Sequence, residues 1–206
     1  MPPLPETADE LKAEAKALGA PSSSVYLRQN VTVTRLKKLD LADTRVVAFA
    51  THGLVAGDLP KLAELALALT PPSRPTKDDD GLLRASEVSQ LKLNADWVVL
   101  SACNTAAADG TPGAEGLSGL AKAFFYAGAR SILVSHWPVD SAATVKLTTS
   151  AFNILKKDPA IGRAEAFRRA MLAMIDNADK STSSAHEASP LYWAPFVVVG
   201  EGGGGR

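Results

Sequence analysis

Short apolar runs alternate along the chain with segments of helical periodicity. Four runs rich in Val, Ile, Leu and Phe are typical of buried strands, at residues 46–50, 97–101, 131–135 and 196–199. Apolar residues recur every three or four positions elsewhere, which predicts helices over residues 7–18, 117–127, 140–156 and 163–175. Strands that alternate with helices indicate an α/β fold with a mainly parallel central sheet flanked by helices.

Details of this pattern give further expectations. Leu11, Ala15 and Leu18 recur at helical spacing in the first helix, which we expect Gly19 to end. Residues 25–27 form a short apolar run that predicts a strand, and we expect Asn30 to cap a helix after it.

Later segments complete the pattern. Ser86 is expected to cap a helix over 86–91, Asp140 is a candidate cap for the helix that follows it, and Gly128 comes just after the 117–127 helix. We expect residues 176–189 to form a polar loop, and residues 1–5 and 200–206 to be flexible.

The stretch between residues 53 and 80 is the least regular part of the chain. It predicts an insertion that is partly hairpin and partly loop, either a plain surface connection or a wall of a cleft. Residues 76–81 contain three consecutive Asp residues before a Gly. A calcium site is one interpretation of this turn, and a solvated polar turn is the favoured one.

Composition excludes several classes of protein. The chain has 206 residues, of which 46% are hydrophobic, enough for one domain with a buried core. Lys+Arg and Asp+Glu are both 22, and this balance argues against a nucleic-acid partner. Apolar runs are shorter than the roughly 18 residues that span a bilayer, so we expect no membrane segment.

Cysteine and histidine are scarce. One cysteine excludes an internal disulfide and suits a reducing compartment, so we expect a cytoplasmic protein. The N-terminus lacks the basic and apolar regions of a signal peptide. Three scattered histidines and one cysteine do not have metal-ligand spacing, so we expect no metal and no cofactor.

The single cysteine and one histidine occupy equivalent places in the pattern. Cys103 follows the 97–101 strand, and His52 follows the 46–50 strand. If these strands are parallel neighbours, their backbones lie roughly 4.8 Å apart. A thiol beside an imidazole forms a thiolate nucleophile at neutral pH, so we expect His52 and Cys103 to be a catalytic pair. A lone buried cysteine that acts as a small hydrophobe is the alternative.

Six ordered motifs make the chain resemble the CHAT domain family, the caspase-like peptidases related to separases, gingipains and caspases. The motifs are Phe49-Ala50-Thr51-His52-Gly53, Leu100-Ser101-Ala102-Cys103-Asn104-Thr105, Glu115-Gly116-Leu117, Ala127-Gly128-Ala129, Trp137-Pro138-Val139-Asp140 and Tyr192-Trp193-Ala194-Pro195-Phe196. The caspase motif Gln-Ala-Cys-x-Gly is not present. The resemblance implies a caspase-like three-layer sandwich and a Cys/His dyad at Cys103 and His52.

This resemblance also implies a function. We expect a cysteine endopeptidase that cleaves a partner protein, with the backbone N–H groups of Gly53 and Cys103 as the oxyanion hole. Residues 1–206 would be a single domain, the excised C-terminal part of a longer protein whose helical repeats regulate it. A catalytically idle scaffold for protein–protein interaction and a hydrolase of small acyl substrates are the alternatives.

Substrate-pocket residues are open at this point. Asp140 is similar to an acidic residue that contacts a basic P1 side chain in separases, and N-capping of the following helix is its alternative. Glu115 is either a second pocket acid or a charge near a helix N-terminus. His136 also follows a strand, and we expect it to be structural or to lie at the rim of the site.

Overall fold

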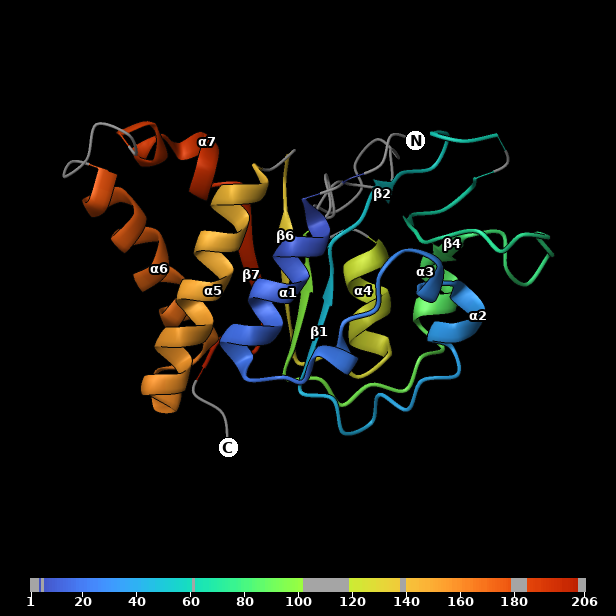
Figure 1. The fold of residues 1–206 in the computed structure, drawn as a ribbon, viewed down its shortest axis with the longest axis horizontal. Helices are drawn as coiled ribbons and strands as arrows, with labels where there is room; N and C mark the ends of the chain where they lie inside the picture. Colours follow the sequence, from blue (N-terminus) through green and yellow to red (C-terminus); the bar gives the residue numbers. More distant parts are fainter. Residues whose placement is uncertain are drawn as a thin grey trace.

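A four-stranded sheet forms the centre of the protein (Figure 1). The computed structural model describes residues 4, 6–60, 62–101, 119–137, 140–178 and 185–203. The strands are β1 (Val46–Phe49), β5 (Trp97–Leu100), β6 (Ser131–Ser135) and β7 (Phe196–Gly200), in the order β1-β5-β6-β7. Neighbouring strands are parallel except for β7, which is antiparallel to β6. The predicted mainly parallel sheet is therefore confirmed.

Helices cover both faces of this sheet and make three layers (Figure 1). One face carries α1 (Thr7–Leu18), α5 (Ser141–Lys157) and α6 (Arg163–Ala178), and the other carries α2 (Val33–Leu36), α3 (Ala85–Val88) and α4 (Gly119–Tyr126). The remaining described helices are short: α7 (Pro190–Trp193), η1 (Ser22–Ser24), η2 (Arg28–Asn30), η3 (Pro159–Ile161) and η4 (Ala185–Ala188). The arrangement agrees with the expected caspase-like sandwich.

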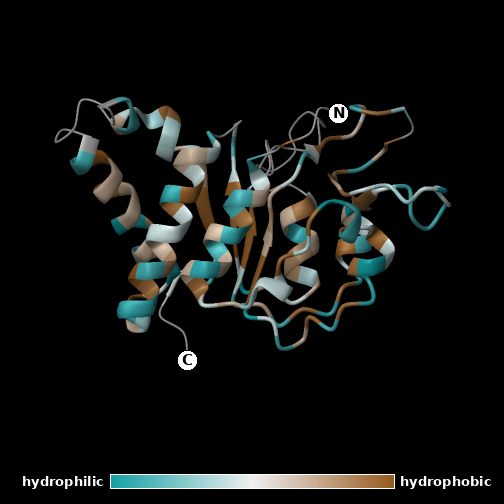
Figure 2. Ribbon diagram, in the orientation of Figure 1, coloured by the Kyte–Doolittle hydropathy of each residue, from teal (hydrophilic) through white to brown (hydrophobic). Residues whose placement is uncertain are grey.

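The alternation of side chains along β5 divides the core in two. Trp97 and Val99 pack on the α5 and α6 side, whereas Val98 and Leu100 pack on the α4 side. All four residues are buried, as expected for a strand covered on both faces. Figure 2 shows that the central strands are mostly apolar and that the helices around them carry both apolar and polar residues.

Several helix boundaries follow the sequence closely. Gly19 ends α1 with φ 74°, a left-handed conformation that glycine adopts without strain. Gly128, after α4, has φ 107°, and a Cβ at this position would lie 2.2 Å from the carbonyl oxygen of Leu93. The backbone conformation therefore favours glycine at both positions, and the close approach of Leu93 requires it at Gly128.

Two expectations near the N-terminus were wrong. Residues 25–27 form no strand, because they connect η1 and η2 and have no strand partner. Thr32 caps α2 by accepting a hydrogen bond from the Arg35 N–H at 3.2 Å. Asn30 instead accepts from the Arg35 guanidinium at 3.2 Å.

Ser86 does not cap the helix that the sequence predicts over residues 86–91. It lies inside α3, whose N-terminal N–H groups are satisfied by two glutamates from different places in the chain. Glu64 accepts from the Ser86 N–H at 2.8 Å, and Glu87 accepts from the Arg84 N–H at 2.9 Å. Acidic side chains thus take the place of the expected serine cap.

The insertion after β1 forms a small antiparallel sheet. It contains β2 (Gly53–Leu54), β3 (Ala66–Ala68) and β4 (Leu82–Arg84), in the order β2-β3-β4. The prediction of a partial hairpin is therefore confirmed and extended by a third strand.

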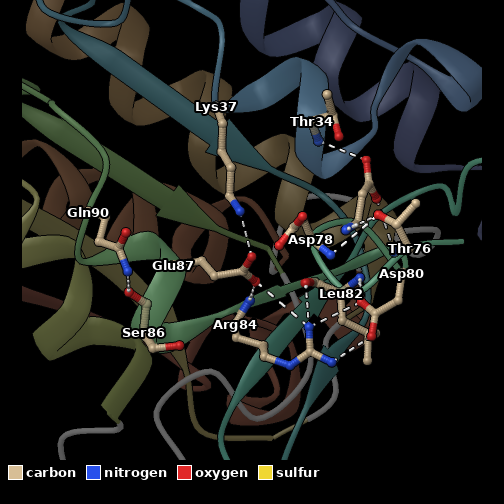
Figure 3. A network of polar contacts seen from close by, with 12 residues as sticks. Thr34, Lys37, Thr76, Asp78, Asp80, Leu82, Arg84, Ser86, Glu87 and Gln90 are labelled. Atoms are coloured by element: carbon tan, nitrogen blue, oxygen red, sulfur yellow. Dashed lines mark hydrogen bonds and ion pairs between the residues drawn. The ribbon is translucent and has the colours of Figure 1, made fainter.

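The acidic turn before β4 joins this small sheet to α2, and Figure 3 shows the surrounding polar network. Asp79 is only 5% exposed and accepts from the Thr34 N–H at 2.8 Å, so the expectation of a solvated turn was wrong for this residue. Asp80 pairs with Arg84 at 2.6 Å, and this hydrogen bond lowers the pKa of Asp80.

The C-terminal part is more ordered than the sequence predicts. α6 extends to Ala178, and η4 occupies part of the expected 176–189 loop. Gly200 pairs with Ser131, the Glu201 N–H donates to the Arg130 carbonyl, and Gly202 accepts from the Ala164 N–H. The start of the stretch that we expected to be flexible is therefore hydrogen-bonded. In the described part of the chain, none of the helices combines the length and apolar character needed to cross a membrane.

Candidate active site

The carboxyl ends of β1, β5 and β6 meet at one edge of the central sheet, where α/β proteins bind their ligands. The last paired positions of β1 and β5 are Phe49 and Leu100, and the Ser101 N–H still donates to the Phe49 carbonyl at 2.9 Å. His52 follows Phe49 by three residues in the chain, and Cys103 follows Leu100 by the same number.

Strand β3 fixes the backbone around His52. The Thr51 hydroxyl donates to the Ala68 carbonyl, and the Ala68 N–H donates to the His52 carbonyl at 2.9 Å. Gly53, directly after the histidine, pairs with Leu67. The insertion is therefore hydrogen-bonded to the histidine segment through β3, which makes it more than a plain surface connection.

The pairing with β3 fixes the direction of the Gly53 N–H. The bond from the Ala68 N–H to the His52 carbonyl makes Gly53 and Leu67 a pair without hydrogen bonds between them. In such an antiparallel pair, both N–H groups point away from the partner strand. The Gly53 N–H is thus directed away from β3 and is not used by this ladder.

Two predicted site residues, Cys103 and Glu115, lie outside the described residues. The structure reaches the end of β5 at Ser101, which is 8% exposed. Asn104, the residue after Cys103, is also outside the described residues. The approach of a sulfur atom to the His52 imidazole therefore stays a prediction.

Asp140 is exposed and caps α5. One carboxylate oxygen accepts from the Ala143 N–H at 2.8 Å, while the Asp140 carbonyl accepts from the Thr144 N–H and hydroxyl. This is the capping role that the sequence predicts, and it is confirmed. A role for Asp140 in a substrate pocket stays a prediction.

The other two histidines are placed differently from His52. His136 is exposed, and its backbone N–H donates to the Pro195 carbonyl at 2.9 Å, beside the start of β7. This position agrees with a structural or rim role. His186 is exposed on η4, with its ring 5.1 Å from that of Tyr192.

Two buried acids on α1 were not predicted. Glu10 and Glu14 are 1% and 2% exposed, although the apolar spacing of Leu11, Ala15 and Leu18 indicates a different inner face. Leu18 is in fact 40% exposed. The buried face is rotated by one residue, and only the i,i+4 spacing of the two glutamates indicates that they share it.

Burial changes the ionisation of both acids. It raises the pKa of Glu10 to about 7, and a hydrogen bond with the Ser101 hydroxyl offsets part of this rise. Burial, with a smaller contribution from the charge of Glu10, raises the pKa of Glu14 to about 8, and the Thr148 hydroxyl offsets part of that rise. Within the described ranges, no three His, Cys, Asp or Glu side chains converge as metal ligands.

Fold and site together define a caspase-like α/β protein with a histidine at the end of a central strand. The chain belongs to the CHAT domain family, which it matches over residues 1–201. CHAT domains are part of the superfamily related to the caspase-like cysteine peptidases.

Two curated relatives are similar to this chain. Tetratricopeptide repeat protein 28 of Mus musculus is 34% identical over 124 residues, which are 58% of this chain and 4% of the relative. Tetratricopeptide repeat protein 28 of Homo sapiens is 32% identical over 161 residues, 76% of this chain and 5% of the relative. The chain thus matches a small part of much longer proteins.

Proposed function

We propose that this CHAT domain is a cysteine endopeptidase that cleaves a partner protein through Cys103 and His52. The register of β1 and β5 is the observation that carries the proposal. Phe49 pairs with Leu100, and each candidate residue follows its strand at the same distance in the chain. Parallel neighbours lie roughly 4.8 Å apart, so equal extensions would bring an imidazole and a thiol to one edge.

The proposed reaction has two stages. The Cys103 thiol gives its proton to His52, its sulfur bonds to the peptide carbonyl carbon, and the carbonyl oxygen becomes an oxyanion. The C–N bond then breaks as His52 protonates the leaving amine, and water hydrolyses the thioester. The Gly53 N–H, directed away from β3, supports its assignment as one oxyanion donor, with the Cys103 N–H as the other.

Helical repeats N-terminal to the domain are proposed to regulate it. Support comes from the two relatives, which are named for tetratricopeptide repeats and are much longer than this chain. Residues 1–206 would then be one domain taken from a longer protein, and the single cysteine suits a cytoplasmic location.

A covalent peptide probe tests the proposal in the full-length protein that contains this domain. We expect peptidyl acyloxymethyl ketones with Arg or Leu at P1 to label Cys103, the only cysteine of the 206 residues, as read by mass spectrometry. His52→Gln should reduce the labelling rate at least about 100-fold, in the range of general acid–base catalysis. His136→Gln is the matched control, because it removes another histidine that follows a central strand.

Equal labelling of the wild type and His52→Gln would contradict the dyad. A wild type that neither reacts with the probes nor cleaves any protein, with repeats and partner present, would favour the catalytically idle scaffold. The ratio of labelling by the Arg and Leu probes would report the P1 preference that Asp140 and Glu115 are proposed to set.

A further inference from the structure

The fully buried side chains of α1 are two glutamates. Glu10 and Glu14 are 1% and 2% exposed, whereas every apolar residue of this helix is half-buried or exposed. Ala17 is the residue of α1 that packs against the apolar core on the α5 side of the sheet. The attachment of the helix therefore depends on how well two acidic side chains tolerate burial.

Both carboxyl groups are enclosed with too few partners for a charge. Oε1 of Glu10 and both carboxyl oxygens of Glu14 are buried, and they have no hydrogen-bond partner in the described part of the chain. The two residues are four positions apart on a helix that packs along α5, so they share one face (Figure 1). A neutral acid tolerates burial far better than an ionised carboxylate without a partner, so the docked helix favours protonated side chains.

The other charged groups of α1 and of the elements around it are exposed to solvent. They are Glu6, Asp9, Lys12 and Lys16 on or beside α1, Arg28 on η2, and Asp140, Lys146, Lys156, Lys157 and Asp158 on or beside α5. Helix η1 and strands β1 and β5 carry no charged residue. The two acids also repel each other, because the charge of Glu10 adds to the rise in the pKa of Glu14. Ionisation of the docked acids is therefore not compensated by the described charges of these elements.

Docking of α1 is therefore linked to proton binding. Burial raises the pKa of Glu10 to about 7 and that of Glu14 to about 8, from an ordinary value of 4.5. In a detached helix both acids would be hydrated and would return to the ordinary value. The docked state holds more protons, so its advantage is fully present below pH 4.5 and is lost as the pH rises through about 7 and 8.

The architecture allows α1 to open while the sheet stays folded. This helix has 12 residues, and its N-cap residue Glu6 makes no capping hydrogen bond with its side chain. Helices shorter than about 12–15 residues are marginal in water, so a detached α1 would lose its helical structure. Its contacts are mainly with α5 and η1, whereas β5 and β6 each lie between two other strands of the central sheet. Opening of α1 is therefore a local event.

We propose that α1 is a pH-sensitive switch: it is docked on α5 while Glu10 and Glu14 are neutral, and it detaches from the folded sheet when they ionise. Detachment would release the N-terminal part of the chain from the central fold. This inference does not depend on the proposed peptidase activity, because the docking of α1 is measurable without a substrate.

Hydrogen exchange in the full-length protein that contains this domain provides the test. Mass spectrometry would follow peptides from α1, β5 and β6 at pH 6, 7, 8 and 9, with each exchange rate divided by the intrinsic rate at that pH. We expect α1 to be protected at pH 6 and to lose at least about 100-fold of its protection by pH 9, because each unit of pKa shift changes the docking equilibrium tenfold. Strands β5 and β6 should remain protected at pH 9.

Variants of the acids identify the groups responsible. The Glu10→Gln/Glu14→Gln double variant should have the same α1 protection at pH 6 and pH 9, because its amides do not ionise, and each single variant should retain part of the pH dependence. Asp9→Asn is the matched control, since it removes an exposed acid of the same helix, and it should follow the wild type. A double variant with the wild-type profile would overturn the proposal.

The wild-type profile alone can also overturn the proposal, even if a variant does not fold. It would do so if α1 were unprotected at pH 6, if α1 kept its protection at pH 9, or if α1, β5 and β6 lost protection together.

Limited digestion with trypsin is an independent measurement of the same opening. Lys12 and Lys16 lie on α1, and cleavage after them requires this helix to unfold locally. Lys156 and Lys157, at the end of α5, are the internal reference. Between pH 7 and 9 we expect cleavage on α1 to rise relative to cleavage on α5, and an equal rise at all four sites would contradict a local opening.

Discussion

Asp140 illustrates how one side chain serves two candidate roles that mutation can separate. Its carboxylate accepts from the Ala143 N–H and caps α5. Asp140→Ala should lower the free energy of unfolding by about 1 kcal/mol through loss of the cap, as measured by urea denaturation. Asp140→Asn keeps a capping oxygen and should cost much less.

The same two variants report on substrate choice. If Asp140 also binds a basic P1 side chain, Asp140→Asn should lower kcat/KM for Arg substrates at least about 10-fold, because a charged hydrogen bond is lost. The value for Leu substrates should be unchanged. Equal effects on the Arg and Leu substrates would show that Asp140 caps α5 but does not select the P1 side chain.

At the scale of elements, the small β2-β3-β4 sheet holds the histidine segment in place. The Thr51 hydroxyl donates to Ala68 on β3, so Thr51→Val removes one of the bonds that fix His52. We expect kcat to fall about 10-fold with a smaller change in KM, since a small misplacement of a catalytic group affects mainly the chemical step.

Thr70→Val is the control for this prediction. Thr70 also donates from its hydroxyl to a backbone carbonyl, that of Arg28, but it lies beyond the end of β3, and its N–H donates to Val31. Thermal unfolding of both variants would show the loss in stability that they share. If Thr51→Val keeps the wild-type kcat, the contact with β3 does not position the histidine.

The central elements could be predicted from sequence because their signals are local. The runs of β-branched residues at β1, β5 and β6 and the capping aspartate before α5 need no knowledge of distant contacts. The wrong expectations depend on contacts between segments far apart in the chain. Glu64 takes over the capping of α3 from 22 residues away, and the buried Asp79 reaches α2 across 45 residues.

The candidate site, like the fold, could be predicted from the sequence only in part. His52 stands at a strand end, as its sequence context indicates, and the register of β1 and β5 supports a pairing with Cys103. The burial of Glu10 and Glu14 was not predictable, because glutamate on a helix is usually solvated. Only the packing of α1 on α5 encloses these two side chains.

For the whole molecule, the two buried acids predict an unusual dependence of stability on pH. In the unfolded chain both would ionise near the ordinary glutamate value of 4.5, whereas burial raises the folded-state pKa of Glu10 to about 7 and that of Glu14 to about 8. The folded state therefore holds more protons in this window. The contribution of these two acids to stability is therefore fully present below pH 4.5 and is lost as the pH rises to about 8.

Urea unfolding at pH 4.5, 6, 7 and 9 measures this effect. One unit of pKa shift corresponds to about 1.4 kcal/mol. We therefore expect the two acids to make the free energy of unfolding at least about 3 kcal/mol lower at pH 9 than at pH 4.5. The Glu10→Gln/Glu14→Gln double variant should lose most of this pH dependence.

Glu165→Gln is the control for that experiment. Hydrogen bonds from Arg168 and Arg169 lower the pKa of Glu165 to about 2, so its contribution to stability is present above pH 4.5 and disappears as the pH falls toward 2. The opposite sign distinguishes an exposed ion pair from an enclosed acid. A double variant with the same pH profile as the wild type would contradict the assignment.

The reversed direction of β7 has a practical consequence for labelling the protein. Phe196 starts this strand beside Ser135, at the edge of the sheet that carries His52, and Gly200 ends it beside Ser131 at the opposite edge. The Arg163 guanidinium donates a hydrogen bond to the Glu201 carbonyl at 2.8 Å. A fluorophore or affinity tag joined after Gly203 would therefore lie at the edge of the sheet opposite His52. It would leave the approach to the histidine open for single-molecule or pull-down work.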